Sequence, residues 1–280
     1  MTSPVPLRHV PPEYTGLWRR EVITAPAFRD ETTQVLWLQT RSWYADLRVP
    51  IDRPAAGPGY SGCGPVELEA LGKIQGFAGE LAVTDGIALW RRDFDRQPPG
   101  DLPDEARCAV DGDVMIEDGL HADYQEIWRR VPGSTGPLAA FGRLGPAGAG
   151  GLLVMAGDHL MEFRARSGPP LSGGSLSEMV AARLAAGDRP AAEELLETRI
   201  RYAVRDAGTW CVRLSSHPWL EDRPIWTRAD FDPASGRLET SDETGTAEWR
   251  LLDANLPAAD LGRLVAGAPR VPEASRQVER

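Results

Sequence analysis

The chain has 280 residues, of which 42% are hydrophobic and 26% are charged, and its formal net charge is −10. This length and composition allow one large or two ordinary globular domains with packed cores. The acidity argues against nucleic-acid binding, which needs a basic surface, and against binding to an anionic membrane. We interpret the charge as favouring solubility.

Residues 1–13 are rich in proline and predict an arm with little regular structure. They lack the apolar core of a signal peptide, and no run in the chain reaches the roughly 20 apolar residues of a membrane span. Cys63, Cys108 and Cys211 lie far apart, which indicates neither a disulfide framework nor a zinc site. We therefore expect a cytoplasmic protein without a metal or an organic cofactor.

The first half of the chain reads as a series of antiparallel strands. The first is expected from Tyr14, and residues 33–50 predict a hairpin in which alternate residues share a face. A Gly- and Pro-rich loop follows at 52–65 and could cover a barrel mouth. Further strands are expected at 76–83, 87–94, 107–110, 113–117 and 124–130, with Asp-Gly turns between two of the pairs. About eight strands with short connections predict a small closed barrel over residues 14–132.

After a linker at 131–136, a second β-series is expected over 136–255. Ser175 and Glu178 form a capping-box pattern, and with Asp188-Arg189-Pro190 they predict two short helices near 175–196. Residues 256–280 are expected to form a loose tail. The predicted fold class is thus mainly all-β, with two antiparallel barrels of which the second carries a helical insert.

Several strands of the first half place polar and aromatic residues at a spacing of two. In the hairpin, Tyr44, Asp46 and Arg48 share a face. If this face points into the barrel, the neighbouring strands add Trp37, Gln39, Trp90, Arg92, Tyr124, Glu126 and Trp128. Arginine forks and aromatic walls suit a polar or anionic small molecule, and a buried Asp46 or Glu126 could act as an acid or base. The alternative is that these charges pair with one another and hold the barrel together.

Two histidines of the second half, His159 and His217, are the other candidates for acid–base chemistry. They fall on separate predicted strands and could meet across a barrel, or each could be a hydrogen-bonded structural residue. The sequence has no Gly-x-Ser-x-Gly elbow, phosphate-binding loop, dinucleotide glycine pattern or His-Glu-x-x-His motif.

Certain motifs resemble those of a known family. Gly16 and Trp18 match the G-x-W signature of lipocalin-type barrels. The remaining motifs are T-x-V-x-W-L-Q from Thr33, Y-A-D-L-R-V-P from Tyr44, Q-G-F-A-G from Gln75, W-x-R from Trp90, Q-P-P from Gln97, Y-x-E-x-W from Tyr124, G-D-H from Gly157 and H-P-W from His217.

Over residues 14–252 the chain resembles bacterial and fungal two-domain lipocalin-like (calycin) proteins, whose fungal branch includes a yeast protein that interacts with a casein-kinase-type enzyme. The resemblance implies two β-barrels side by side and implies no reaction or catalytic residue.

Three functions remain open at this point. The first is binding of a polar or anionic small molecule in a barrel cavity. The second is a cofactor-independent enzyme, such as an isomerase, cyclase, dehydratase or lyase, that works through acid–base residues in that cavity. The third is a protein-interaction scaffold with solid barrels. The expected partner is a small-molecule ligand or substrate, and no nucleic acid or membrane; the oligomeric state is open.

Overall fold

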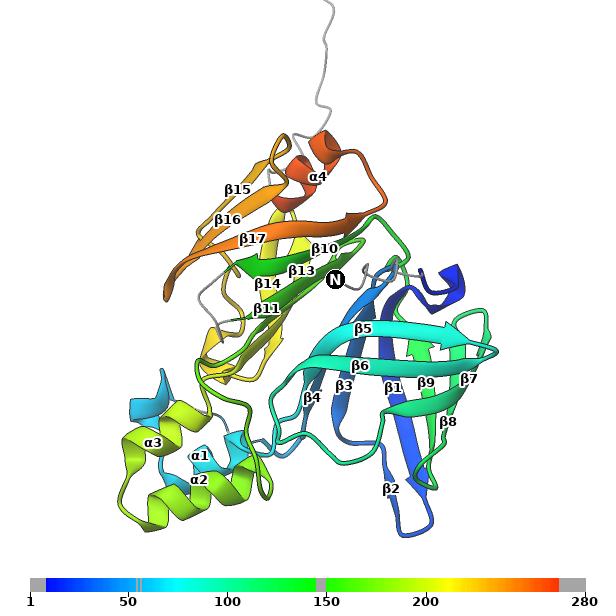
Figure 1. Ribbon diagram of the computed structural model, residues 1–280. Helices are drawn as coiled ribbons and strands as arrows, with labels where there is room; N and C mark the ends of the chain where they lie inside the picture. Colours follow the sequence, from blue (N-terminus) through cyan, green and yellow to red (C-terminus); the bar gives the residue numbers. More distant parts are fainter. Residues whose placement is uncertain (1–8, 54, 56, 145–149, 267–280) are drawn as a thin grey trace, which may run out of the picture.

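The structure is a computed structural model that describes residues 9–53, 55, 57–144 and 150–266. It is built from two antiparallel sheets, one for each half of the chain, and three of the helices gather at one end (Figure 1). Parts of the predicted arm, of the 52–65 loop and of the predicted tail lie outside the described residues. No helix in the described part of the chain is long and apolar enough to span a bilayer.

The first sheet is a closed barrel. Its order is β2-β1-β3-β4-β5-β6-β7-β8-β9, and pairing between β1 and β9 closes it, while β2 only extends the long hairpin that leaves β1. Eight strands therefore form the ring, as the sequence predicts. The strands are β1 Gly16–Ala25, β2 Phe28–Asp30, β3 Gln34–Gln39, β4 Trp43–Val49, β5 Phe77–Thr84, β6 Ile87–Asp95, β7 Glu105–Asp111, β8 Val114–Gly119 and β9 Gln125–Arg130.

Tryptophan side chains fill the inside of this barrel. Trp37 lies at the centre, with its ring centroid 6.3 Å from Trp18, 5.6 Å from Trp90 and 5.8 Å from Trp128. The Trp18 indole N–H donates to the Tyr14 carbonyl oxygen at 2.8 Å, so its polar atom is satisfied in the interior. These large rings come from four strands, and together they leave little space.

The second sheet is open. Its order is β14-β13-β12-β11-β10-β17-β16-β15, and its two edge strands, β14 and β15, do not pair with each other. The prediction of a second closed barrel is therefore wrong, and the sheet is a half-barrel. The strands are β10 Leu138–Leu144, β11 Gly151–Ala156, β12 His159–Arg164, β13 Arg199–Asp206, β14 Thr209–Ser215, β15 Arg228–Asp232, β16 Arg237–Asp242 and β17 Gly245–Ala254.

A C-terminal helix explains how one end of the open sheet is covered. α4, Ala258–Val265, lies within residues expected to form a loose tail. Its Leu261, Leu264 and Val265 are buried in the same apolar cluster as Trp249 on the inner face of the sheet. The spacing of three and four residues places these side chains on one helix face. The helix therefore covers apolar surface that barrel closure would otherwise bury.

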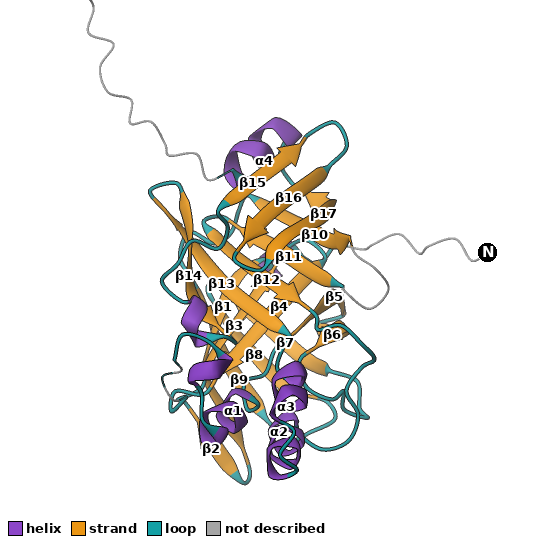
Figure 2. Ribbon diagram, turned by 90° about the vertical axis from the view of Figure 1, so that its left-hand side faces the viewer, coloured by secondary structure: helices purple, strands orange, loops and turns teal. Residues whose placement is uncertain are grey.

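The predicted helical insert is present. α2 runs over Leu176–Ala185 and α3 over Arg189–Leu195. The capping box is formed as expected, since the Ser175 hydroxyl accepts from the Glu178 backbone N–H and the Glu178 carboxylate accepts from the Ser175 N–H at 2.8 Å. These helices lie beside α1, Pro65–Leu71 (Figure 2). The short 3-10 helices are η1 Pro12–Tyr14, η2 Tyr60–Gly62 and η3 Pro218–Leu220.

The two sheets share one apolar core. Leu38 and Leu47, on the outer face of the barrel, are fully buried in one cluster with Val154, Met161 and Phe163 from the outer face of the second sheet. Each strand involved is therefore covered on both faces, which matches its near-continuous hydrophobic sequence. This core holds the two halves together.

Candidate functional site

The polar face of the early hairpin points into the first barrel. Asp46 is 1% exposed, and the Arg48 Nε–H donates to its carboxylate at 2.9 Å. Burial raises the pKa of Asp46 even though Arg48 opposes the shift. The space beside these residues and Trp37, Trp90 and Trp128 measures only about 10 Å³. That is the room for about one water molecule and not for an organic ligand.

The other predicted ligand-binding residues of this barrel are bonded to the protein itself. Gln39 accepts from the Trp37 indole and donates to the Thr40 carbonyl oxygen at 2.9 Å. Arg92 is at the rim, where it pairs with Asp95 at 3.0 Å and with Asp104 at 2.6 Å. The Tyr44 ring is fully buried, with its centroid 6.0 Å from Phe77. The arrangement corresponds to the alternative in which these charges stabilise the barrel.

Glu126 belongs to a pair of buried carboxyl groups that the sequence interpretation recognised only in part. One of its oxygens is 2.8 Å from Arg20, while the other has no hydrogen-bond partner among the described residues. Glu117 lies directly opposite on β8 and accepts from the Tyr124 hydroxyl and the Trp128 indole, both at 3.0 Å. Burial and the neighbouring Glu126 raise the pKa of Glu117 to about 8. The sequence feature that could have identified Glu117 is its spacing of two from Met115, whose side chain faces the barrel interior.

The second sheet has a much larger opening. A pocket of about 560 Å³ lies where the inner face of the half-barrel becomes polar, and its size is typical of small-molecule sites. Arg143 of β10, Arg164 of β12 and Arg199 of β13 contribute to its wall. The sequence interpretation missed these arginines, although Glu162 and Arg164, and Arg199 and Arg201, show the same spacing of two as Asp46 and Arg48.

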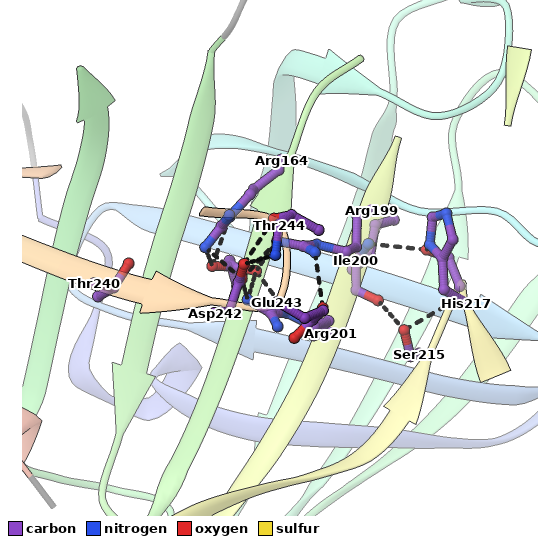
Figure 3. A network of polar contacts seen from close by, with 12 residues as sticks. Arg164, Arg199, Ile200, Arg201, Ser215, His217, Thr240, Asp242, Glu243 and Thr244 are labelled. Atoms are coloured by element: carbon purple, nitrogen blue, oxygen red, sulfur yellow. Dashed lines mark hydrogen bonds and ion pairs between the residues drawn. The ribbon is translucent and has the colours of Figure 1, made fainter. Parts of the chain in front are cut away.

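Arg164, Arg199 and Arg201 surround the carboxylate of Asp242 (Figure 3). They also surround a second buried carboxylate, that of Glu162. Glu162 is 2.8 Å from Arg164 and 2.6 Å from Arg201, and Asp242 is 2.8 Å from Arg199 and from Arg201. Burial alone would raise the pKa of Glu162, but Arg201, Arg164 and Arg199 outweigh it and lower the pKa to about 2. Both carboxylates are therefore charged at neutral pH, and Arg199 also pairs with the partly exposed Glu243 at 3.3 Å.

Arg143 adds a further positive charge. Among the described residues it forms no ion pair, and its buried Nε atom has no hydrogen-bond partner. Burial and the nearby Arg164 lower its pKa from the ordinary value, yet a guanidinium remains protonated at neutral pH. With Arg166, Arg223, Glu197 and Glu243 included, the pocket and its base hold six arginines and four carboxylates. The site is thus positive in a protein whose net charge is −10.

The rest of the pocket wall includes Tyr60, His217 and Trp219. The Tyr60 hydroxyl is 2.7 Å from His217 Nε2, and His217 Nδ1 is 3.0 Å from the Ser216 hydroxyl. Tyr60 belongs to the 52–65 segment of the first half, and Arg189 of α3 holds it by donating to its carbonyl oxygen. This segment, which the sequence suggests could cover a barrel mouth, thus contributes to the pocket of the second sheet.

The two histidines do not form a joint site. His159 Nδ1 is 2.8 Å from the Tyr202 hydroxyl, and His159 lies opposite Val204 on β13. His217 follows Ser215, which lies opposite Arg201 at the other end of the same strand. His217 therefore contributes to the arginine pocket, whereas His159 has a separate, buried hydrogen bond. Among the described residues, no group of three or more His, Cys, Asp or Glu could hold a metal ion.

No family model matches the sequence, and no curated protein matches it either. Among solved structures, the fold is similar to the crystal structure of the uncharacterized protein YLR301w from Saccharomyces cerevisiae, with a TM-score of 0.54 and 13% sequence identity. The likeness covers 86% of this chain and 99% of that chain. At this identity the likeness concerns the fold alone.

Proposed function

We propose that the protein binds a small organic anion in the pocket of the second sheet, with Arg143, Arg164 and Arg199 as the groups that hold it. We also propose that it is a relative of the two-domain lipocalin-like proteins. The arrangement of a barrel beside a curved antiparallel sheet supports this relationship, together with the motifs from Gly16 to Trp219.

The observation that carries the proposal is the excess of buried positive charge. Three arginines share two buried carboxylates and the partly exposed Glu243, and Arg143 has no partner among the described residues. A charge removed from water is costly unless an opposite charge compensates it. A carboxylate or phosphate group would supply that compensation, and the planar guanidinium fork matches its geometry.

The size of the pocket indicates an organic molecule. A volume of about 560 Å³ exceeds the space that a lone inorganic oxyanion fills, and it agrees with the ligand pockets of roughly 300–1,000 Å³ found in proteins. The aromatic rings of Tyr60 and Trp219 offer apolar contact area for the body of the ligand. By contrast, the interior of the first barrel, with Asp46, Arg48 and Glu126, is filled and internally paired, and we assign it a structural role.

Calorimetric titration with phenyl phosphate and with benzoate tests the proposal, since the two probes share a ring and differ in their oxyanion. Arg143→Ala should weaken binding by about 10- to 100-fold, because it removes a hydrogen-bond donor that carries a charge. The variant should fold normally, because no carboxylate of the described residues depends on Arg143.

Arg250→Ala is the matched control. Arg250 is exposed on the neighbouring strand β17 and has no ion pair or side-chain hydrogen bond among the described residues. It should leave the affinity unchanged. The proposal would be abandoned if the wild-type protein bound neither probe, or if the two arginine variants weakened binding equally.

A further inference from the structure

The hydrogen bonds around His217 leave two arrangements open. His217 is 6% exposed, its Nε2 faces the Tyr60 hydroxyl at 2.7 Å and its Nδ1 faces the Ser216 hydroxyl at 3.0 Å. Both neighbours can donate or accept. Burial and the nearby Arg96, Arg199 and Arg201 lower the pKa of His217 well below its ordinary value, so the ring is neutral and holds one proton. The nitrogen that holds this proton decides the direction of the hydrogen bonds that connect Ser216, His217 and Tyr60.

In the first arrangement every proton has an acceptor inside the protein. The Tyr60 hydroxyl donates to Nε2, the Nδ1–H donates to Ser216, and the Ser216 hydroxyl donates to the Thr198 carbonyl oxygen at 3.4 Å. This last contact is long for a bond between a hydroxyl and a carbonyl oxygen and is therefore weak. Ser216 also accepts from the Ile200 backbone N–H at 2.9 Å, which holds its oxygen in place.

In the second arrangement the ring proton is on Nε2. Ser216 then donates to Nδ1, Nε2–H donates to the Tyr60 oxygen, and the Tyr60 hydroxyl proton is free to point into the pocket. Both arrangements contain the same three protons, on Tyr60, His217 and Ser216. The His217 ring changes from one form to the other by exchanging its proton with solvent. The protein gives up only the long Ser216–Thr198 bond, but the Tyr60 hydroxyl now needs an acceptor outside this chain.

From this geometry we infer that Ser216, His217 and Tyr60 form a hydrogen-bond relay that presents the Tyr60 hydroxyl to the bound anion, and that binding selects the Nε2–H form of His217. The inference rests on the proposed function and deepens it. Tyr60 is a binding residue that donates to the oxyanion beside the arginines, and His217 is a positioning residue that acts through Tyr60. The ligand is thus an anion that offers an unprotonated oxygen at the Tyr60 side of the pocket.

The structure also contains a matched pair for comparison. Tyr202 and His159 make the same kind of contact, at 2.8 Å, but neither residue lines the arginine pocket. The chain has only four histidines, so each ring can be assigned by substitution. His159 therefore serves as an internal reference for any change at His217.

The first measurement is long-range nitrogen NMR of the histidine rings in the full-length wild-type protein, titrated with phenyl phosphate. We expect the protonated nitrogen of His217 to change from Nδ1 to Nε2 as the probe saturates the site, while the His159 signals stay in place. Saturation without any change at His217 would refute the relay.

The second measurement compares two variants by calorimetry. Tyr60→Phe keeps the ring but loses the donor, and it should weaken phenyl phosphate binding by about 10- to 100-fold. Tyr202→Phe should bind as the wild type does. Equal affinity of Tyr60→Phe and the wild type overturns the relay and leaves the arginine pocket as the anion site. If the wild-type protein does not bind the probe, both the relay and the proposed function fail. Should Tyr60→Phe not fold, the NMR measurement on the wild type still decides.

Discussion

At the scale of single residues, the carboxyl groups of Glu117 and Glu126 face each other on β8 and β9 inside the closed barrel. Burial and Glu126 raise the pKa of Glu117 to about 8, against an ordinary value of 4.5. In the folded protein Glu117 therefore holds its proton over a pH range in which the unfolded chain has released it. The free energy of unfolding consequently decreases as the pH rises from about 4.5 through 8.

Glu117→Gln should remove this pH dependence, because the neutral amide replaces the protonated carboxyl group. Relative to the wild type, the variant should gain stability between pH 5 and pH 9, by an amount of order a few kcal/mol. Urea unfolding at several pH values measures the difference. Asp118→Asn, at the exposed neighbouring position, should follow the wild-type profile. Parallel profiles for Glu117→Gln and the wild type would show that Glu117 titrates normally.

At the scale of secondary-structure elements, one buried guanidinium connects two helices with the second sheet. Arg96 follows β6 and is 1% exposed. It donates to the carbonyl oxygens of Leu71 at the end of α1, Leu196 at the end of α3, and Thr198 just before β13. Helix C-termini have free carbonyl groups and favour a positive charge, so Arg96 satisfies both needs. Burial lowers its pKa to about 10, which leaves it charged at neutral pH.

Arg96→Met should destabilise the protein by roughly 2 kcal/mol or more, because three buried carbonyl groups lose their donor. The effect should be local as well, with faster amide hydrogen exchange in α1 and α3 than in β7 and β8. Arg91→Met provides the control, since Arg91 is exposed on β6, the strand that precedes Arg96. Unchanged exchange in the two helices would argue against a connecting role for Arg96.

At the scale of the whole molecule, the two halves are bound along an apolar core that belongs to both. Leu47 and Phe163 are fully buried in it. Ion pairs extend the contact, since Arg41 donates to Asp253 at 2.9 Å and Arg53 donates to Glu221 at 2.9 Å. Neither half can expose this surface to water without a large cost in free energy. The arginine pocket also needs both halves, because Tyr60 and His217 come from different ones.

We therefore expect a single cooperative unfolding transition in calorimetry. Leu47→Ala should shift the whole transition to lower temperature, at a cost of about 2–5 kcal/mol for a large side chain lost from a packed core. Leu102→Ala, at a position that is 65% exposed, should have little effect. Two separate transitions, of which only one responds to Leu47→Ala, would mean that the halves fold independently.

The sequence by itself determined the local features of this protein. Alternation at a spacing of two located the strands and placed Asp46 and Arg48 on one face of the hairpin, since side-chain direction in a strand depends only on position along it. It did not determine which face lies inside the barrel. The same locality let Ser175 and Glu178 predict the start of α2.

The tertiary structure decided what depends on distant contacts. Four tryptophans from four strands meet and fill the first barrel, the edge strands of the second sheet remain apart, and Tyr60 contacts His217 across 157 residues of chain. An inward-facing charged residue lines a cavity only if the other side chains inside the barrel leave space unfilled. That volume is set by residues far apart in the sequence, which no local pattern specifies.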